Sequence, residues 1–203
     1  MKVGVTAAII VGLVGLCSAA LGIEGEVYGL YSPLRNVNGL IEQHEAAASI
    51  ELPALHVGFG GALRADLFPI LGEGVLYFGG RGAAYSVEER DTELRTSHVG
   101  IVVGMSYPIG RLIASADLGL YRGSFAFPSA RYADSSGWSG GVSGTATYRL
   151  QVTARLAVGA SVLAQWVPFN EMADSEGQTY RGRGTPFVDF GGIGGSIHLV
   201  WDF

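Results

Sequence analysis

Residues 192–203 read GIGGSIHLVWDF and decide the fold class of this chain. One alternating set is apolar or aromatic and includes Ile193, Ile197, Leu199, Trp201 and Phe203. The other set is small or polar and includes Gly192, Gly194, Ser196, His198 and Asp202. A period of two indicates a β-strand with two different faces. Because the chain ends on an aromatic residue within this strand, we expect the strand to close a β-barrel in a membrane.

The composition supports short apolar strands over apolar helices. Hydrophobic residues make up 48% of the 203 residues and charged residues only 15%, below the roughly 25% of soluble domains. No run of about 20 apolar residues follows the N-terminal segment, which excludes a helical span in the body of the chain. The formal net charge of −5 and the scattered arginines argue against nucleic-acid binding.

The first 22 residues have the pattern of a secretory signal peptide. Lys2 supplies a positive charge, residues 3–16 are apolar, and small residues such as Ala20 and Gly22 follow. We expect cleavage after one of these two residues, which divides the chain into a signal peptide (1–22) and a barrel domain (23–203). Cys17 would be removed with the signal, so that the mature domain has no disulfide.

Alternation continues along the whole domain and predicts eight strands. They are expected near 24–32, 54–67, 74–88, 98–107, 112–121, 138–151, 154–166 and 192–203. Long connections are expected at 33–48, 88–96, 123–136 and 168–186, and short turns at 68–72, 108–110 and 151–152. Long external loops that alternate with short periplasmic turns are typical of transmembrane barrels. An even number of strands places both ends of the domain on the short-turn side.

The second face of these strands indicates which side meets lipid. It carries mainly Gly, Ala, Ser and Thr with one or two charges per strand, too few for a soluble exterior. Small polar residues suit the interior of an eight-stranded barrel, which side chains can fill, and closure pairs every strand edge, as hydrocarbon requires. We therefore predict an all-β fold: an antiparallel up-and-down transmembrane barrel with its apolar face outward.

Two sets of residues follow from this assignment. The predicted polar network of the lumen comprises His56, Arg64, Asp66, Arg81, His98, Asp117, Arg149, Arg155, His198 and Asp202. The predicted aromatic girdles at the two lipid–water interfaces comprise Tyr31, Phe68, Tyr107, Tyr121, Trp138, Tyr148, Trp166 and Phe187. Charges in a lumen must be paired or hydrated, so we expect an internal ion-pair network.

In these features the chain resembles the small outer-membrane barrels of the OmpA transmembrane-domain and OmpX kind, over about residues 24–203. The resemblance implies location in the outer membrane of a Gram-negative-type envelope. It also implies that the barrel-assembly machinery recognises Ile197, Leu199, Trp201 and Phe203 during biogenesis. Outer-membrane lipid would be the permanent partner.

The function expected from these residues is that of a structural or surface-interaction scaffold with a plugged polar lumen and four external loops, which can contact a surface ligand. Two alternatives stay open: a narrow channel or OmpW-like passage for small solutes, and an enzyme located at the barrel rim. Enzyme signatures are weak: His44 and Glu45, for example, lack the second His of a zinc-protease helix. We therefore predict a protein that is not an enzyme, binds no metal and needs no cofactor.

Overall fold

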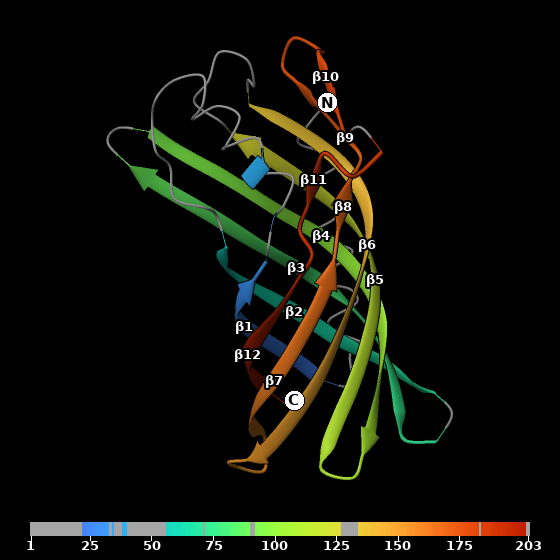
Figure 1. Cartoon of the computed structure of the whole chain (residues 1–203). Helices are drawn as coiled ribbons and strands as arrows, with labels where there is room; N and C mark the ends of the chain where they lie inside the picture. Colours follow the sequence, from blue (N-terminus) through green and yellow to red (C-terminus); the bar gives the residue numbers. More distant parts are fainter. Residues whose placement is uncertain are drawn as a thin grey trace, which may run out of the picture.

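Eight strands form a closed ring in the computed structural model, which describes residues 22–32, 34, 38–39, 56–70, 72–89, 92–126, 134–182 and 184–201. The ring strands are β1 (Gly22–Tyr31), β2 (Val57–Ile70), β3 (Gly74–Glu89), β4 (Thr92–Ile109), β5 (Leu112–Ala126), β6 (Ser135–Gln151), β7 (Leu156–Trp166) and β12 (Gly192–Trp201). Each pairs antiparallel with its neighbours, and β12 joins β7 to β1 (Figure 1). The predicted all-β barrel class is confirmed.

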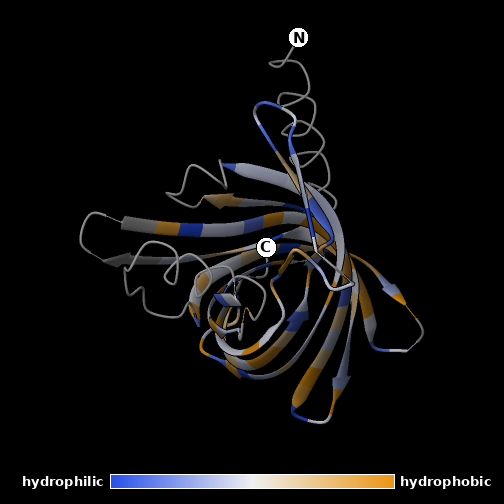
Figure 2. Cartoon of the chain, turned by 45° about the horizontal axis from the view of Figure 1, so that its top comes forward, coloured by the Kyte–Doolittle hydropathy of each residue, from blue (hydrophilic) through white to orange (hydrophobic). Residues whose placement is uncertain are grey.

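Alternation places the side chains as the sequence predicts along most of the ring, and polar and apolar residues alternate along the strands in Figure 2. On β4, for example, Ile101 and Val103 are exposed on the outer face, while Val102 and His98 are buried inside. A β-bulge between Asp66 and Phe68 shifts the register of β2 against β3. Because a bulge adds one residue to a strand, Phe68 reaches the outer face.

The connections differ in length at the two ends of the barrel. Residues 71–73, 110–111 and 152–155 join strand pairs at one end, where β1 also begins and β12 ends. The expected long loop at 88–96 is wrong, because β3 and β4 continue as a hairpin in which Glu89 pairs with Thr92. The expected loop at 123–136 is also too long, since β5 extends to Ala126 and β6 starts at Ser135. Polar residues in these segments hide the continued pairing from a sequence pattern.

The fourth long connection, residues 167–191, contains four short strands. These are β8 (Pro168–Phe169), β9 (Glu171–Asp174), β10 (Thr179–Arg181) and β11 (Val188–Asp189). β9 pairs with β10 and with the upper end of β6, and β8 pairs with β11. This connection therefore stands as a folded layer at the end of the barrel opposite the short turns (Figure 1).

Six of the eight residues predicted for the aromatic girdles are exposed on the outer wall. Tyr31, Trp138 and Trp166 lie toward the long-loop end, and Phe68, Tyr107 and Tyr148 toward the short-turn end. The girdle prediction is wrong for Tyr121 and Phe187. Tyr121 is buried inside the barrel because it shares the parity of Asp117 on β5, and Phe187 is buried within the folded connection.

Inward tyrosines pack on glycines of neighbouring strands. A Cβ on Gly104 would lie 2.6 Å from the ring of Tyr77 and 2.5 Å from the backbone oxygen of Ala116. Tyr121 covers Gly100 in the same way, and Tyr85 covers Gly58. Missing side chains at these positions make room for flat aromatic rings against the wall, so glycine acts here as a packing residue.

We expect Gly104→Ala to destabilise the barrel by about 1–3 kcal/mol, because the new methyl group must displace both a buried ring and a backbone oxygen. Urea unfolding of the refolded protein in lipid vesicles measures the effect. Gly80→Ala is the matched control, since its Cβ would meet its nearest atom at 3.6 Å. Equal stability losses in the two variants would contradict this account of the glycines.

Candidate functional site in the barrel interior

The lower half of the interior, toward the short turns, contains a cluster of charged side chains. Glu24 of β1 accepts hydrogen bonds from Arg64 of β2 and Arg149 of β6, so one carboxylate joins two arginines from opposite sides of the ring. The Glu24 side chain is only 5% exposed. Arg64 also lies 4.7 Å from the ring centre of Tyr77 and donates to Ser115 over 3.3 Å.

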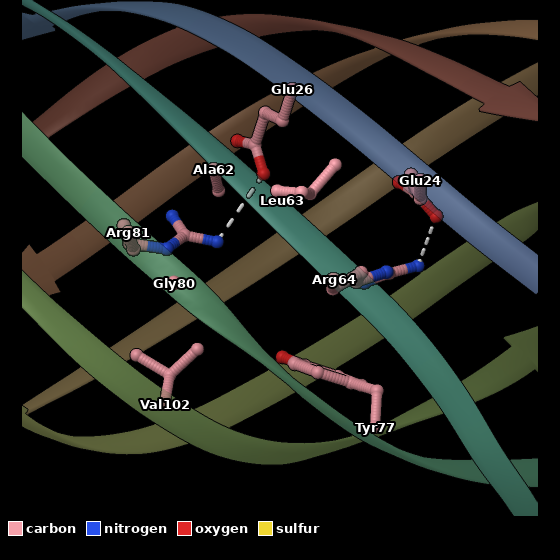
Figure 3. Close-up of a pocket in the computed structure, with 9 residues that line it drawn as sticks. All are labelled: Glu24, Glu26, Ala62, Leu63, Arg64, Tyr77, Gly80, Arg81 and Val102. Atoms are coloured by element: carbon pink, nitrogen blue, oxygen red, sulfur yellow. Dashed lines mark hydrogen bonds and ion pairs between the residues drawn. The ribbon is translucent and has the colours of Figure 1, made fainter. Parts of the chain in front are cut away.

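A second set of charges lies one layer further along the strands. Arg81 of β3 contacts Glu26 at 3.3 Å and Asp117 of β5 at 3.7 Å. Asp117 accepts hydrogen bonds from Tyr77 (3.0 Å) and Ser143 (2.6 Å). Figure 3 shows Glu26 facing Arg81 and Glu24 facing Arg64, with Tyr77 beside them. Glu24 and Glu26 lie two residues apart on β1, so the two sets are adjacent, and together they are called the polar layer below.

Little space remains inside this polar layer. The cavity lined by Glu24, Glu26, Arg64, Tyr77 and Arg81 has a volume of about 10 Å³. A cavity needs roughly 10–15 Å³ to hold one water molecule. The side chains therefore pack closely around this cavity, and each arginine of the layer lies against a carboxylate.

An apolar cap occupies the upper half of the interior. Phe169, Val188 and Phe190 of the folded connection 167–191 are fully buried. Phe190 lies 5.5 Å from Phe169, 5.8 Å from Tyr85 and 4.7 Å from His98, measured between ring centres. Buried aromatic rings in contact contribute strongly to packing. Residues of the connection thus pack against inward side chains of β3 and β4 at the end of the barrel opposite the short turns.

The cap and the polar layer meet at Gln165 and His98. The Gln165 Nε2 atom donates to the carbonyl oxygen of Phe190 (3.3 Å) and lies 3.2 Å from the His98 Nε2 atom. His98 also contacts the edge of Tyr121, with ring centres 5.6 Å apart. These contacts fix the cap to the barrel wall through β4 and β7.

Four residues of the predicted lumen network lie together in the polar layer, and the others lie elsewhere. Arg64, Arg81, Asp117 and Arg149 form its ion pairs, and His98 is buried above them. Half-buried Asp66 lies lower on β2, opposite Tyr77, and interacts electrostatically with Arg149 at the edge of the polar layer. Half-buried His56 stacks on Tyr31 with ring centres 5.7 Å apart.

The lumen prediction is wrong for Arg155, because this residue is exposed in the turn 152–155. β7 begins at Leu156, so Arg155 precedes the strand, and the inward–outward alternation that predicted an inward side chain does not apply to it. The side chain of His198, Asp202 and the side chains of Leu199, Trp201 and Phe203 lie outside the described residues. Ile197, the remaining residue of the predicted assembly signal, is exposed on the outer wall.

Sequence reasoning missed the two carboxylates at the centre of the polar layer. Glu24 and Glu26 fall in the strand predicted near 24–32, but the predicted lumen network does not contain them. The alternation of this strand contains the necessary information. Glu24, Glu26 and Tyr28 fall on one face, while Val27 and Tyr31 fall on the other, apolar face. A pair of glutamates two residues apart in an apolar strand therefore indicates inward charges that need cations opposite.

The exposed hairpin of β9 and β10 carries its own polar anchor. Asp174 accepts hydrogen bonds of 2.9 Å from the backbone N–H groups of Glu176 and Gln178 and from the Tyr180 hydroxyl. Desolvation is the largest single influence and raises the pKa of the Asp174 carboxyl, but the hydrogen bonds from Tyr180, Gln178, Glu176 and Gly177 together lower it by more. The pKa therefore lies below its ordinary value.

A lowered pKa means that the Asp174 carboxylate stabilises the hairpin at neutral pH, and that this contribution is lost as the pH falls through the lowered pKa. We expect amide hydrogen exchange at Glu176 and Gln178, corrected for the intrinsic rate, to accelerate under strong acid. Asp174→Ala should show that faster exchange already at neutral pH. Glu171→Gln, which removes only an exposed ion pair with Arg181, serves as the control. Unchanged exchange in Asp174→Ala would refute the role of this carboxylate.

No group of three or more His, Cys, Asp or Glu side chains could hold a metal ion in the described part of the chain. None of the helical segments described is both long and apolar enough to cross a membrane.

Comparison with known proteins shows the fold. No protein-family model matches the chain, and no curated protein matches its sequence. The crystal structure of Neisserial surface protein A (NspA) is similar with a TM-score of 0.50 and 14% identity, over 90% of this chain and 96% of that one. Ail, the attachment invasion locus protein of Yersinia pestis, solved with the heparin analogue sucrose octasulfate, gives a TM-score of 0.45 and 10% identity, over 89% and 96% of the two chains. The chain thus has the fold of small eight-stranded outer-membrane β-barrels.

Proposed function

We propose that this eight-stranded barrel is an outer-membrane scaffold whose lumen is closed and whose external loops form an interaction surface. The single observation that supports the proposal is the packing of buried side chains at two levels of the interior. Ion pairs around Glu24 and Arg81 lie in the lower half, and the buried rings around Phe190 lie in the upper half. A barrel filled in this way serves as a support for its loops and not as a pore.

The outer wall supports a location in the membrane. Trp138 and Tyr148 are both exposed on β6 and stand ten residues apart. At about 3.3 Å per residue and a tilt of about 40°, that separation is about 25 Å along the barrel axis. This equals the height of the apolar band of outer-membrane barrels. Aliphatic side chains such as Ile101, Leu118 and Val162 are exposed on the wall.

Export and assembly belong to the same proposal. The N-terminal segment would direct the chain across the inner membrane, and cleavage would leave a domain that begins at or near β1 (Gly22–Tyr31). The final strand, β12, would present Ile197, Leu199, Trp201 and Phe203 to the barrel-assembly machinery. The folded connection 167–191 and the other long loops would then face the outside, where a surface ligand can reach them.

Planar-bilayer recording of the refolded protein tests the closed lumen. We expect no discrete conductance steps from the natural sequence. A variant that opens both levels, with Glu24→Ala, Arg64→Ala and Phe190→Ala together, should conduct if it folds, and heat-modifiable gel migration reports folding. Discrete steps from the natural protein whose size changes in Arg81→Ala would overturn the closed lumen in favour of a narrow channel.

A further inference from the structure

Arg122 of β5 places a positive charge on the outward face of the barrel. Leu118 and Leu120 precede it on the same face and are at least half exposed, whereas the intervening Tyr121 is buried inside. Arg122 is itself exposed. It is therefore the first charged side chain above the apolar part of this strand, toward the long-loop end.

The depth of Arg122 matches the external lipid–water interface. Arg122 pairs with Trp138 of β6, an exposed aromatic residue of the long-loop end. Leu112, ten residues earlier on β5, pairs with Tyr148 of the short-turn end. At about 3.3 Å per residue and a tilt of about 40°, ten residues rise about 25 Å, which equals the height of the apolar band. The guanidinium group of Arg122 thus belongs to the layer of the lipid headgroups and their phosphates.

The neighbours of Arg122 on this face provide no counter-charge. Val99 pairs with it on β4, and hydroxyl groups lie one outward position further up, where Ser97 pairs with Ser124 and their oxygens are 2.8 Å apart. None of the outward positions adjacent to Arg122 on β4, β5 and β6 carries a carboxylate. Among the described residues this guanidinium forms no ion pair. A cation beside hydroxyl donors suits an anion with several acceptor oxygens, such as a phosphate.

The positive charge is confined to one side of the barrel. The exposed Arg95 lies on the outward face of β4 and adds a second cation near Arg122. On the opposite side, the outward residues at the long-loop ends of β1, β2, β7 and β12 are aromatic or aliphatic, namely Tyr31, Val57, Trp166 and Ile193. An anionic headgroup therefore finds its counter-charge on the side of β4 and β5.

We propose that Arg122 binds the phosphate headgroup of an anionic lipid in the external leaflet. The guanidinium group donates to the phosphate oxygens, the hydroxyl pair of Ser97 and Ser124 supplies a further donor, and the acyl chains lie along Val99 and Leu120. This inference rests on the membrane location given in the proposed function, but it does not depend on a closed lumen.

Titration of dilauroylphosphatidic acid into the barrel in phosphatidylcholine nanodiscs tests the proposal. The indole N–H of Trp138, the residue paired with Arg122, reports binding through its NMR signal. We expect a saturable shift with the phosphatidic acid. Dilauroylglycerol has the same acyl chains without the phosphate, and we expect it to bind more weakly by about tenfold or more. Inorganic phosphate, which has no acyl chains, should give no saturable shift at the same concentrations.

Arg122→Gln should weaken the binding of phosphatidic acid by about tenfold or more, because it removes the charge at the headgroup. Arg111→Gln is the matched control, since it removes the same charge from an exposed residue in the turn 110–111 at the other end of the barrel. Heat-modifiable migration should be unchanged in both variants.

Three results would overturn the headgroup site: equal affinities in Arg122→Gln and Arg111→Gln, equal affinities for phosphatidic acid and dilauroylglycerol, or saturation by inorganic phosphate with the affinity of the lipid. The last result would assign the site to soluble anions. Each of them leaves the folded barrel and its planar-bilayer recording unaffected, so failure of this inference is distinguishable from failure of the closed lumen.

Discussion

Glu24→Ala is expected to destabilise the barrel by about 3–5 kcal/mol, because it removes the buried carboxylate that both Arg64 and Arg149 contact. Loss of one partner of a buried ion pair costs more than the pair itself contributes, since the remaining charge stays desolvated. Here a single carboxylate serves two arginines, so both charges lose their partner at once. Urea unfolding in lipid vesicles, followed by tryptophan fluorescence, gives the free-energy difference.

Glu171→Gln is the matched control for that experiment. Glu171 also pairs with an arginine, Arg181, at 2.7 Å, but both side chains are more than half exposed. Exposed ion pairs contribute about 0–1 kcal/mol, so this variant should be close to the natural protein. A double variant, Glu24→Gln with Arg149→Gln, should recover part of the loss. A loss below about 1 kcal/mol in Glu24→Ala would mean that water already solvates the polar layer.

Phe190→Ala is expected to cost about 3–5 kcal/mol, the range for truncating a fully buried phenylalanine. The ring contacts Phe169, Tyr85 and His98, which come from the cap and from two strands of the barrel. Its removal separates the cap from the wall. We therefore also expect faster amide hydrogen exchange in the segment 167–190, while the lower strands stay protected.

Phe68→Ala provides the comparison for Phe190→Ala. Phe68 is half exposed on the outer wall, so its truncation leaves no cavity in the interior. We expect its cost to be smaller, and the exchange of residues 167–190 to stay unchanged. If Phe190→Ala left both stability and exchange unaltered, the cap would not be anchored through this ring.

The interior shows where prediction from sequence reaches its limit. Arg64, Arg81, Asp117 and Arg149 could be assigned to the inward face, because parity along a strand is a local property. Their partners could not be named, since register and tilt decide which strands face each other across the ring. Glu24 meets Arg149 across 125 positions of the chain. The inward prediction for Arg155 is wrong, because the alternation of a strand does not determine the residue at which the strand begins.

The burial of residues from the connection 167–191 could not be predicted from the alternation of apolar and polar residues. Phe187 was assigned to a girdle and the segment 168–186 to a surface loop, because aromatic residues among polar ones look alike in both places. The structure buries Phe169, Phe187 and Phe190 in the mouth of the barrel. Short strands of two to four residues, such as β8 and β9, leave no pattern long enough to detect.

The sequence by itself determined the barrel class, its outward face and most of its strands, because alternation is set by the geometry of each strand alone. The stretch 192–203 shows this best, since the apolar residues at its alternate positions identify a lipid-facing strand without knowledge of the neighbouring strands. Only the tertiary structure decided what fills the barrel. The ion pairs around Glu24 and the packing around Phe190 both depend on contacts between segments far apart in sequence.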